Sequence, residues 1–591
     1  MRLIDLPTTE EKAQNLRNAS RTFSVLQRNF SPLPGHIFGY WLSDQTVKVF
    51  STEKIINDFG HARRGLQTGC SPRFIRFWHE TEAGKTLLEE LPRSECIKSH
   101  KRWFLFNNGG DFRKWHGNVD YVVNWESNGR DIKATGKAII PSEHRYFEEG
   151  VTWSRLGGGR TAFRLLRQGI IPGDTGPTIF TDGDRRLMLG YLNTAVCESF
   201  LKVLVPSMTF LTGDIENLPF KALPSAATES VHTVVNECVS LASADWDNFE
   251  TSWDFRNQPL LRSGLKGATL EVSWRNWQAQ SAAAIQRMKE LETENNRMFI
   301  AAYGLGGELQ PDVPEAQITL ARADARRDMA AFISYAVGCM MGRYSLDQPG
   351  LILADAGATM QDYLAKVIDP GFLPDTDGIL PITDPSWFDD DLASRIEEFL
   401  IVTFGKDTLE ENFRYLTGSL GVNLNESPRA TLRRYLMDEF YKNHLSGERA
   451  YGYKNRPIYW LFSSGKQKAF QCLVYLHRYT PGTLARIRTE YVIPLQGKLS
   501  AMITRIGGDP DKGGQGGEIA ATSSSVTRKK LQTDLDKAKK QMVELLAYDE
   551  QLRSYTNHPI TLDLDDGVKT NYAKFGTLVA ESKKICGTKD D

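Results

Sequence analysis

The stretch RLMLGYLNTAVCESFLKVLV, residues 186–205, carries apolar side chains at helical spacing and is followed by Pro206. Before it, short apolar runs alternate with turn residues, and YVVNW (121–125) has the β-branched and aromatic content of a strand. After it, FLTGDIENLPF (210–220) predicts a loop with a short strand or turn, and helical patterns then dominate. The sequence therefore predicts a predominantly helical α+β protein, in which an α+β region is followed by helical ones.

Helical periodicity characterises most of the chain after residue 220. One long amphipathic helix is expected over 270–305, and RPIYWLFSS (456–464) predicts a strand. The segment 345–385 is rich in Gly, Pro and Asp, which predicts loops. Residues 468–506 predict a helix with a break near Pro481. Further helices are expected over 221–250, 321–342, 390–404 and 427–445.

The C-terminal region contains a candidate helical hairpin. GGDPDKGGQGGEIAATSSS (507–525) has the composition of a flexible linker. The run that follows it, residues 528–555, has apolar residues near heptad spacing. Two helices joined by a short Gly/Ser linker predict an antiparallel pair. The spaced apolar residues are Leu531, Leu535, Met542, Leu545 and Leu552.

Composition excludes several classes of protein. The 591 residues include 72 Lys and Arg and 73 Asp and Glu, so a polycation or an acidic tail is excluded. No run of about 18 apolar residues occurs, so no membrane partner is expected. The seven cysteines are widely spaced without a CxxC pair, which favours free thiols in a reducing, cytoplasmic setting. They are Cys70, Cys96, Cys197, Cys238, Cys339, Cys472 and Cys586.

Catalytic signatures are missing from the sequence. No GxxxxGK[ST] loop, HExxH pair or Pro-Pro dipeptide occurs, and the glycine-rich runs RLGGGR (155–160) and GLGGE (304–308) are interpreted as turns. The acidic run 389–391 is compatible with a metal, but its place before an apolar helix favours a helix cap. The acids at 563, 565 and 566 lack calcium-loop spacing, and His477 is interpreted as a satisfied, partly buried side chain. We therefore assign no catalytic, cofactor-binding or metal-binding residue to this chain.

Three basic, aromatic-containing segments are the main positive signal. They are residues 61–76, 107–118 and 151–167. Arg and Lys suit phosphate contacts, while Arg, Asn and Gln can read base edges. The alternative is a solvated surface whose arginines pair with acids of the same chain. The candidate DNA-binding residues are Arg63, Arg64, Gln67, Thr68, Arg73, Arg76, Asn107, Asn108, Arg113, Lys114, Asn118, Arg155, Arg160 and Arg164.

Several runs resemble a known family. GLQTGCSPRFIRFW (65–78), residues 106–126, EGVTWSRL (149–156) and residues 189–220 resemble the DNA-recognition region of BREX phage-exclusion adenine methyltransferases. The last run is also similar to the end of target-recognition domains in type I and type IIG restriction systems. Runs over 245–255, 294–305, 334–351, 455–492 and 562–575 resemble the C-terminal half of the same family, so the resemblance covers nearly the whole chain from about residue 30.

The resemblance implies a division of labour. A family member is expected to have an upstream methyltransferase domain with an S-adenosylmethionine loop and an Asn-Pro-Pro-Tyr motif, and this sequence has neither. The chain is thus expected to bind double-stranded DNA and to need a catalytic half or partner chain that holds S-adenosylmethionine, so its own status as an enzyme stays open. Other BREX proteins are further possible partners, and a non-catalytic scaffold of a phage-defence complex is the alternative. Arg343 and Tyr344, on a helix interpreted mainly as a packing element, are additional candidates for DNA contact.

The same resemblance assigns the expected domains. Residues 1–35 are a lead-in from the missing catalytic domain, and residues 36–220 are a DNA target-recognition domain. Residues 221–350 form a helical domain, residues 351–475 form a helical domain with short strands, and residues 476–591 contain the hairpin and a C-terminal tail.

Overall fold

The computed structural model describes Pro34 and residues 42–157, 160–205, 208–508, 516–555 and 558–587. Helices make up about 51% of the chain and strands about 10%, in small sheets, which confirms the predominantly helical α+β class. Apart from Pro34, the expected lead-in over 1–35 lies outside the described residues.

The chain folds into two compact units, each assembled from separated segments. The 34 residues of helix α10 (Leu270–Tyr303) are shared between the units. The domain boundaries expected at 220, 350 and 475 stay predictions. Unit 1 contains the residues up to Ile75, Leu87–Trp246 and Ala283–Ala321, and unit 2 contains Arg76–Thr86, Asp247–Ala282 and Arg322–Asp591.

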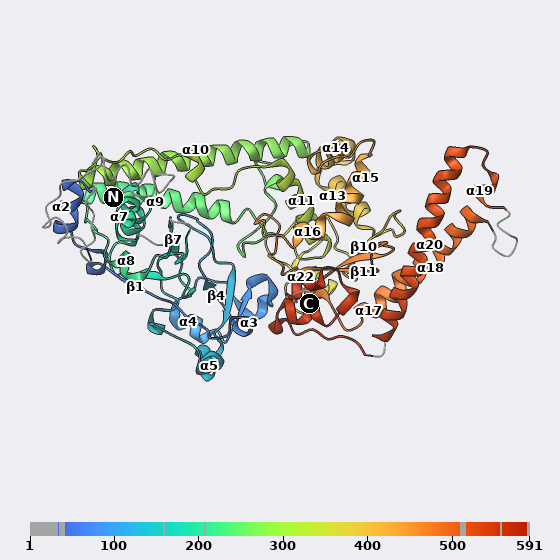
Figure 1. Ribbon diagram of the computed structural model, residues 1–591, viewed down its shortest axis with the longest axis horizontal. Coiled ribbons are helices and arrows are strands. Elements are labelled where there is room, and N and C mark those ends of the chain that lie inside the picture. The colour runs from blue at the N-terminus through green and yellow to red at the C-terminus, as the bar shows by residue number, and fades with distance from the viewer. Residues whose placement is uncertain are drawn as a thin grey trace, which may run out of the picture. The chain divides into compact units, whose positions relative to one another are not determined.

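Unit 1 is an α+β unit in which helices cover a small antiparallel sheet (Figure 1). This sheet has the strand order β1-β9-β6-β7, with Val151 opposite Ile179 and Leu165. A second sheet contains β4 paired antiparallel with β5 and parallel with β8, so the strand predicted over 121–125 is confirmed. The strands are β1 His61–Arg63, β4 Trp103–Asn107, β5 Tyr121–Asn124, β6 Gly150–Trp153, β7 Phe163–Leu166, β8 Ile171–Pro172 and β9 Thr178–Phe180. The helices are α2 Asp44–Thr52, α3 Ser71–Phe74, α4 Arg93–Lys98, α5 Glu126–Ala134, α6 Arg185–Leu192, α7 Ala195–Leu204, α8 Thr212–Glu216 and α9 Ser225–Trp246.

The stretch 186–205 forms two helices rather than one. Helices α6 and α7 are bent by 70° at Asn193 and Thr194. The Thr194 side chain accepts a hydrogen bond from the backbone N–H of Cys197, which caps the start of α7. The apolar spacing continues across the break, because both helices pack on the same core with Tyr191 and Phe200 buried. The bend explains why the periodicity alone suggested a single helix.

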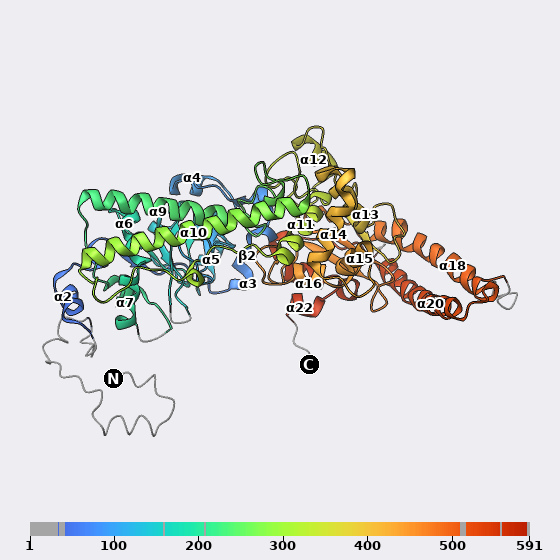
Figure 2. The same ribbon diagram turned by 90° about the horizontal axis from the view of Figure 1, so that it is seen from above.

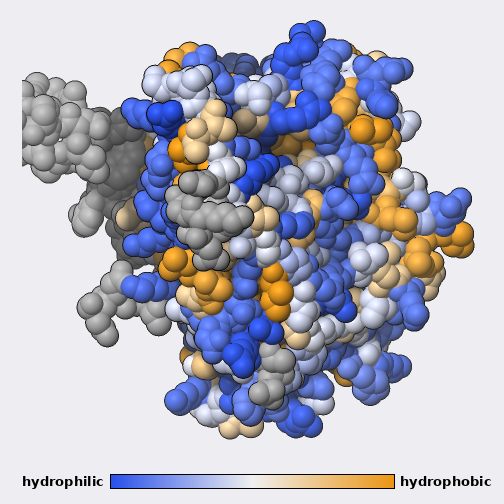
Figure 3. Space-filling model, turned by 90° about the vertical axis from the view of Figure 1, so that its right-hand side faces the viewer, coloured by the Kyte–Doolittle hydropathy of each residue, from blue (hydrophilic) through white to orange (hydrophobic). Residues whose placement is uncertain are grey.

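The lengths and compositions of the helices bear on whether the chain contains a membrane span. Within the described ranges, no single helix is long and apolar enough to cross a membrane, although the bent pair α6 and α7 passes together on length and composition. Both helices bury most of their apolar side chains inside unit 1. The face seen in Figure 3 is mostly hydrophilic, with apolar side chains in small separate groups.

Unit 2 contains most of the expected helices around one large core. The helices expected over 270–305, 321–342 and 390–404 are confirmed, and so is the strand over 456–464. The strands are β10 Ile379–Ile382, β11 Tyr459–Ser463 and β12 Gln471–Tyr475, and β2 Ile75–Phe77 and β3 Thr86–Leu87 lie where the chain passes between units. The helices are α11 Ala325–Met340, α12 Met360–Lys366, α13 Leu392–Phe404, α14 Leu409–Leu420, α15 Pro428–Asp438, α16 Phe440–His444, α17 Thr483–Arg486, α18 Ile493–Gly507, α19 Glu518–Ala521, α20 Ser525–Ser554, α21 Val568–Ala573 and α22 Ser582–Cys586.

Two expectations for unit 2 were wrong in part. Residues 471–475, expected in a helix, form strand β12 in the middle of the sheet β10-β12-β11. All five residues are buried, and a short buried apolar run does not distinguish a strand from a helix by its periodicity. The segment 345–385, expected as loops, contains helix α12 and strand β10.

The acidic runs and His477 have structural roles. Asp391 accepts a hydrogen bond from the Ala393 N–H at the start of α13, which confirms its role as a helix cap. Asp563 caps a short 3-10 turn over Leu564–Asp566. His477 is fully buried in a 3-10 turn rather than a helix, with Nε2 3.1 Å from the Thr81 carbonyl oxygen.

Helices α18 and α20 form the expected antiparallel hairpin, seen at the right of Figure 1 and again in Figure 2. Leu545, Tyr548 and Leu552 of α20 join the core of unit 2, whereas Leu535 lies closer to the tip and packs near Gly507. Of the expected linker over 507–525, residues 509–515 lie outside the described part of the chain. Residues 518–521 of the linker form helix α19.

Candidate functional site

The three basic segments meet at one turn of unit 1, IPGDTG (171–176). The Leu66 N–H donates to the Pro172 carbonyl at 2.8 Å, and the Asp174 N–H donates to the Leu66 carbonyl at 3.2 Å. Gly65 makes this approach possible, because an added Cβ would lie 2.1 Å from the Pro172 oxygen. Folding therefore places the first basic segment directly against the turn.

Asp174 collects basic side chains from two of the segments. Arg64 donates from Nε to its Oδ1 at 2.7 Å, and Arg155 donates from Nη1 to its Oδ2 at 2.7 Å. Burial alone would raise the pKa of Asp174, but hydrogen bonds from Gln67 and Arg64 and the charge of Arg155 outweigh it and lower the pKa. The side chain of Arg64 is still 50% exposed, so part of its guanidinium faces solvent. We call Arg64, Gln67, Arg155 and Asp174 the Asp174 cluster.

The second segment contacts the other side of the same turn. Asn107 is fully buried and donates from Nδ2 to Thr152 Oγ1 at 2.6 Å and to the Gly176 carbonyl at 3.2 Å. The Thr175 hydroxyl donates to the backbone carbonyl of Asn108 at 2.8 Å. In this structure both asparagines shape the turn, and Asn107 has no surface to offer to a ligand.

Arg113 and Lys114 are held inside unit 1 by acids from distant helices. Arg113 Nη2 lies 2.6 Å from Asp245 of α9, and the guanidinium stacks over the Trp246 ring at 4.9 Å. Lys114 Nζ lies 2.7 Å from Glu292 of α10. Because all four charged side chains are almost fully buried, these ion pairs fasten the segment to the helices.

Arg164 and Asn118 are likewise buried. Arg164 donates from Nη1 to the Arg113 carbonyl at 3.1 Å and from Nη2 to the Ser154 hydroxyl at 3.2 Å. Burial, together with the charge of Arg113, lowers the pKa of Arg164 to about 10. Asn118 donates to the Asp111 carbonyl at 2.7 Å. Both side chains hold neighbouring backbone in place.

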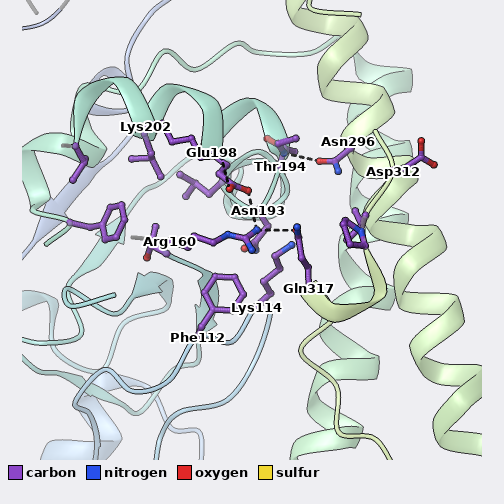
Figure 4. A pocket seen from close by; sticks show the side chains of 18 residues that line it. Phe112, Lys114, Arg160, Asn193, Thr194, Glu198, Lys202, Asn296, Asp312 and Gln317 are labelled. Carbon is purple, nitrogen blue, oxygen red and sulfur yellow. Dashed lines mark hydrogen bonds and ion pairs between the residues drawn. The ribbon is translucent and has the colours of Figure 1, made fainter. Parts of the chain in front are cut away.

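Arg160 lines a pocket of about 280 Å³ beside the break between α6 and α7 (Figure 4). Its Nη2 lies 3.2 Å from Glu198 of α7 and 2.9 Å from Gln317, and its guanidinium stacks on Phe112 at 5.4 Å. The pocket also reaches the start of α7, where the Ala195 N–H donates to Asn296 at 2.8 Å. Arg160 thus connects the third segment to the helices while 38% of its side chain stays exposed.

A second pocket of about 390 Å³ lies between the second and third segments. Its lining consists of Gly110, Asp111 and Phe112 from the second segment and Ser154, Leu156, Gly157, Arg160, Thr161, Ala162 and Arg164 from the third. Of its two arginines, Arg160 keeps exposed surface, whereas the Arg164 side chain is buried and donates to groups of unit 1.

The remaining candidates lie apart from the Asp174 cluster. Arg63 is 41% exposed and donates to Glu216 of α8 at 3.2 Å, and Arg73 is exposed and stacks over Phe74. Thr68 is buried. Arg76 belongs to unit 2, where it is buried and donates to the Asp565 carbonyl at 2.9 Å.

The candidates therefore divide by exposure. Asn107, Arg113, Lys114, Asn118 and Arg164 are buried within unit 1. Arg113 and Lys114 pair with acids of the chain, but in the interior and not on a solvated surface. Arg63, Arg64, Arg73, Arg155 and Arg160 keep exposed surface. Among the described residues, no group of three or more His, Cys, Asp or Glu side chains could hold a metal ion.

Sequence reasoning missed Asp174, around which the cluster forms. The third basic segment predicted from the sequence ends at residue 167 and leaves out Asp174. The run Pro-Gly-Asp-Thr-Gly over 172–176 is nevertheless a strong turn signal. This turn signal, which directly follows the basic segment, could have identified Asp174 as a candidate partner of the arginines. Glu216 gave no comparable signal, because only the fold brings it to Arg63.

Comparison with curated proteins identifies relatives of the chain. It is 34% identical over 97% of its length to "Adenine-specific methyltransferase PglX" of Lacticaseibacillus casei (strain Zhang), and 33% identical over 99% to "Adenine-specific methyltransferase BrxX" of Escherichia coli O9:H4 (strain HS). The chain is homologous to these adenine-specific methyltransferases. No family model matches it.

The chain spans about half the length of these methyltransferases. It covers 47% of PglX and 48% of BrxX. Since the similarity extends over nearly all of this chain, both the Asp174 cluster and unit 2 lie within the part shared with PglX and BrxX.

Proposed function

We propose that this chain is the DNA-recognition part of a BREX-type adenine-specific (N6) DNA methyltransferase in phage defence. The observation that carries the proposal is its similarity, over nearly its whole length, to two adenine-specific methyltransferases. The exposed arginines around Asp174 support it, since guanidinium groups held by acids keep a fixed geometry and can still donate to phosphates and base edges.

Methyl transfer would then need a separate catalytic part that binds S-adenosylmethionine. Nucleotide-type cofactors are commonly held by a glycine-rich turn between a strand and a helix. Here Gly157 follows β6 but leads to another strand, β7, and the glycines of 304–307 follow helix α10. Neither glycine-rich run lies between a strand and a following helix, so we assign S-adenosylmethionine binding and the flipping of the adenine to the catalytic part.

Within that enzyme, this chain would select the site. Phosphate contacts from Arg63 and Arg73 would fix the register of the duplex, and Arg64, Gln67 and Arg155 would lie where base edges can be read. The favourable contacts would offset the few kcal/mol that flipping a base costs.

A second candidate function is a non-catalytic scaffold of a phage-defence complex. The observation that favours it is the internal pairing of Arg113, Lys114 and Arg164, which removes these residues from any DNA surface. Capture of defence proteins by a chain without affinity for DNA would support the scaffold over the recognition part.

The proposal is tested by equilibrium binding of the purified chain to duplex DNA over a range of salt concentrations. We expect the logarithm of the binding constant to fall linearly with the logarithm of salt concentration. Arg63→Ala with Arg64→Ala should reduce that slope by about 0.9 for each phosphate that the variant no longer neutralises. The matched control is Arg275→Ala with Arg326→Ala, two arginines that are also exposed and ion-paired. No binding at low salt, or equally weakened binding in both double variants, would contradict the proposal.

A further inference from the structure

The hairpin of unit 2 carries a basic outer surface for which the proposed function gives no role. Over Ser525–Gln541 of α20 there are six basic residues and two acidic ones. The basic residues are Arg528, Lys529, Lys530, Lys537, Lys539 and Lys540, all exposed, and we call them the hairpin basic face.

The geometry of α20 separates this face from the packed one. Leu535, Ala538 and Gln541 are buried against the rest of unit 2, and the basic residues occupy the other sides of the same turns. At about 1.5 Å per residue, the basic side chains from Arg528 to Lys540 extend along about 18 Å of the helix. That length corresponds to several phosphates of a duplex, which carries about one charge per 1.7 Å of axis.

Within the described part of the chain, few acids neutralise the charges of this face. Lys537 lies 3.0 Å from Asp384, and Arg528 donates to the Thr522 carbonyl. Lys529, Lys530, Lys539 and Lys540 form no ion pair with any residue that the structure describes. This differs from the Asp174 cluster, where the arginines are paired with an acid of the chain.

The composition of the face favours a polyanionic backbone as its partner. Lysine is a flexible point charge suited to phosphate contact, whereas base reading favours the planar Arg, Asn and Gln groups. The surface in Figure 3, which is viewed from the side where α18 and α20 lie in Figure 1, is mostly hydrophilic. Exposed apolar residues on α20 are few, with Val526 and Val543 the most exposed.

We infer that the hairpin basic face binds the phosphate backbone of double-stranded DNA, independently of sequence. This inference rests on the proposed function for its ligand, and adds to it a second contact surface that lies in unit 2. The hairpin would hold the duplex while the Asp174 cluster reads the site.

The test uses the full chain and a random-sequence duplex of about 30 base pairs. The variant Lys529→Gln, Lys530→Gln, Lys539→Gln and Lys540→Gln is compared with Lys406→Gln, Lys442→Gln, Lys569→Gln and Lys584→Gln. The control removes the same charge from exposed lysines of unit 2 outside the hairpin. For the hairpin variant we expect affinity to fall at least tenfold at about 0.1 M salt, and the salt slope to be smaller by about 0.9 for each phosphate left without its lysine. For the control we expect a change of less than about twofold.

The outcomes separate this inference from the proposed function. If the hairpin variant binds as tightly as the unmodified chain while Arg63→Ala with Arg64→Ala weakens binding, the inference is overturned and the proposed function stands. The hairpin would then face a protein partner. If only the hairpin variant loses affinity, the inference stands and the role of the Asp174 cluster is overturned. Equally weakened binding in the hairpin variant and its lysine control would also overturn the inference, since any removal of charge would then suffice.

Discussion

Arg113 shows how a basic residue of a candidate binding segment acts inside the protein. Its guanidinium donates to Asp245 and to the His116 carbonyl and stacks on Trp246. Arg113→Met should lower the free energy of unfolding of unit 1 by about 3–5 kcal/mol, because it leaves the Asp245 carboxylate buried without its counter-charge. Thermal unfolding followed by tryptophan fluorescence measures this destabilisation.

Two variants serve as controls for Arg113→Met. Combining it with Asp245→Asn should restore part of the stability, since no unpaired charge is then buried. Arg275→Ala, which breaks an exposed pair with Glu271, should cost less than about 1 kcal/mol. Equal effects of Arg113→Met and Arg275→Ala would show that the buried pair is not stabilising.

His477 should make the stability of unit 2 depend on pH. Burial and then the charge of Arg343 lower the pKa of His477 to about 4, whereas an unfolded histidine has a pKa of about 6.5. Between these values the unfolded chain binds the extra proton, so stability falls as the pH is lowered from 6.5 towards 4, by up to about 1.4 kcal/mol per unit. Urea unfolding at pH 5.0, 5.5 and 6.0 measures the free energy of unfolding. In His477→Gln this free energy should fall less steeply with decreasing pH, by up to about 1.4 kcal/mol per pH unit.

Other buried groups near His477 also titrate. Burial lowers the pKa of His444 to about 3 and holds that of His79 well below its usual value, so both act in the same direction. Burial raises the pKa of Glu250 to about 7, which opposes them, since the folded state then binds the extra proton between about pH 4.5 and 7. Only the difference between His477→Gln and the unmodified chain therefore isolates His477. Identical pH profiles would contradict the role given to its burial.

At the scale of elements, the hairpin should behave as a locally stable unit. Leu535 is 5% exposed and lies near Gly507 of α18, outside the main core of unit 2. Leu535→Ala should destabilise the tip by about 2–5 kcal/mol, which hydrogen exchange measures as faster exchange in 496–507 and 525–540. Val543→Ala, at a side chain that is 70% exposed, is the control. Unchanged exchange in Leu535→Ala would show that the tip is not held by this contact.

The helices and strands also show which elements sequence patterns predict correctly. Long helices such as α10 and α13 follow from periodicity and caps, because these signals are local. Strand β12 does not follow from periodicity, since all five of its residues are buried and four of them, Cys472–Tyr475, form a continuous apolar run. The candidate site shows the same contrast between local signals, which the sequence reveals, and long-range contacts, which it does not. The basic segments were visible in the sequence, but Asp245 and Glu292, which neutralise Arg113 and Lys114, lie 132 and 178 residues further along the chain.

At the scale of the whole molecule, the chain combines an α+β unit and a mainly helical unit that share helix α10. Its relatives are adenine-specific methyltransferases about twice as long. The proposed division of labour assigns site selection to the Asp174 cluster and sequence-independent binding of the DNA backbone to the hairpin basic face. The same proposal assigns methyl transfer to a separate part that would bind S-adenosylmethionine.

The most direct test of this division is selection of duplexes from a randomised DNA pool by the purified chain alone, without S-adenosylmethionine or another polypeptide. The bound duplexes are then sequenced. We expect enrichment of one short motif, because site recognition is assigned to this chain. A bound pool with the same sequence composition as the input would contradict the central claim, and so would a failure to retain any DNA at low salt.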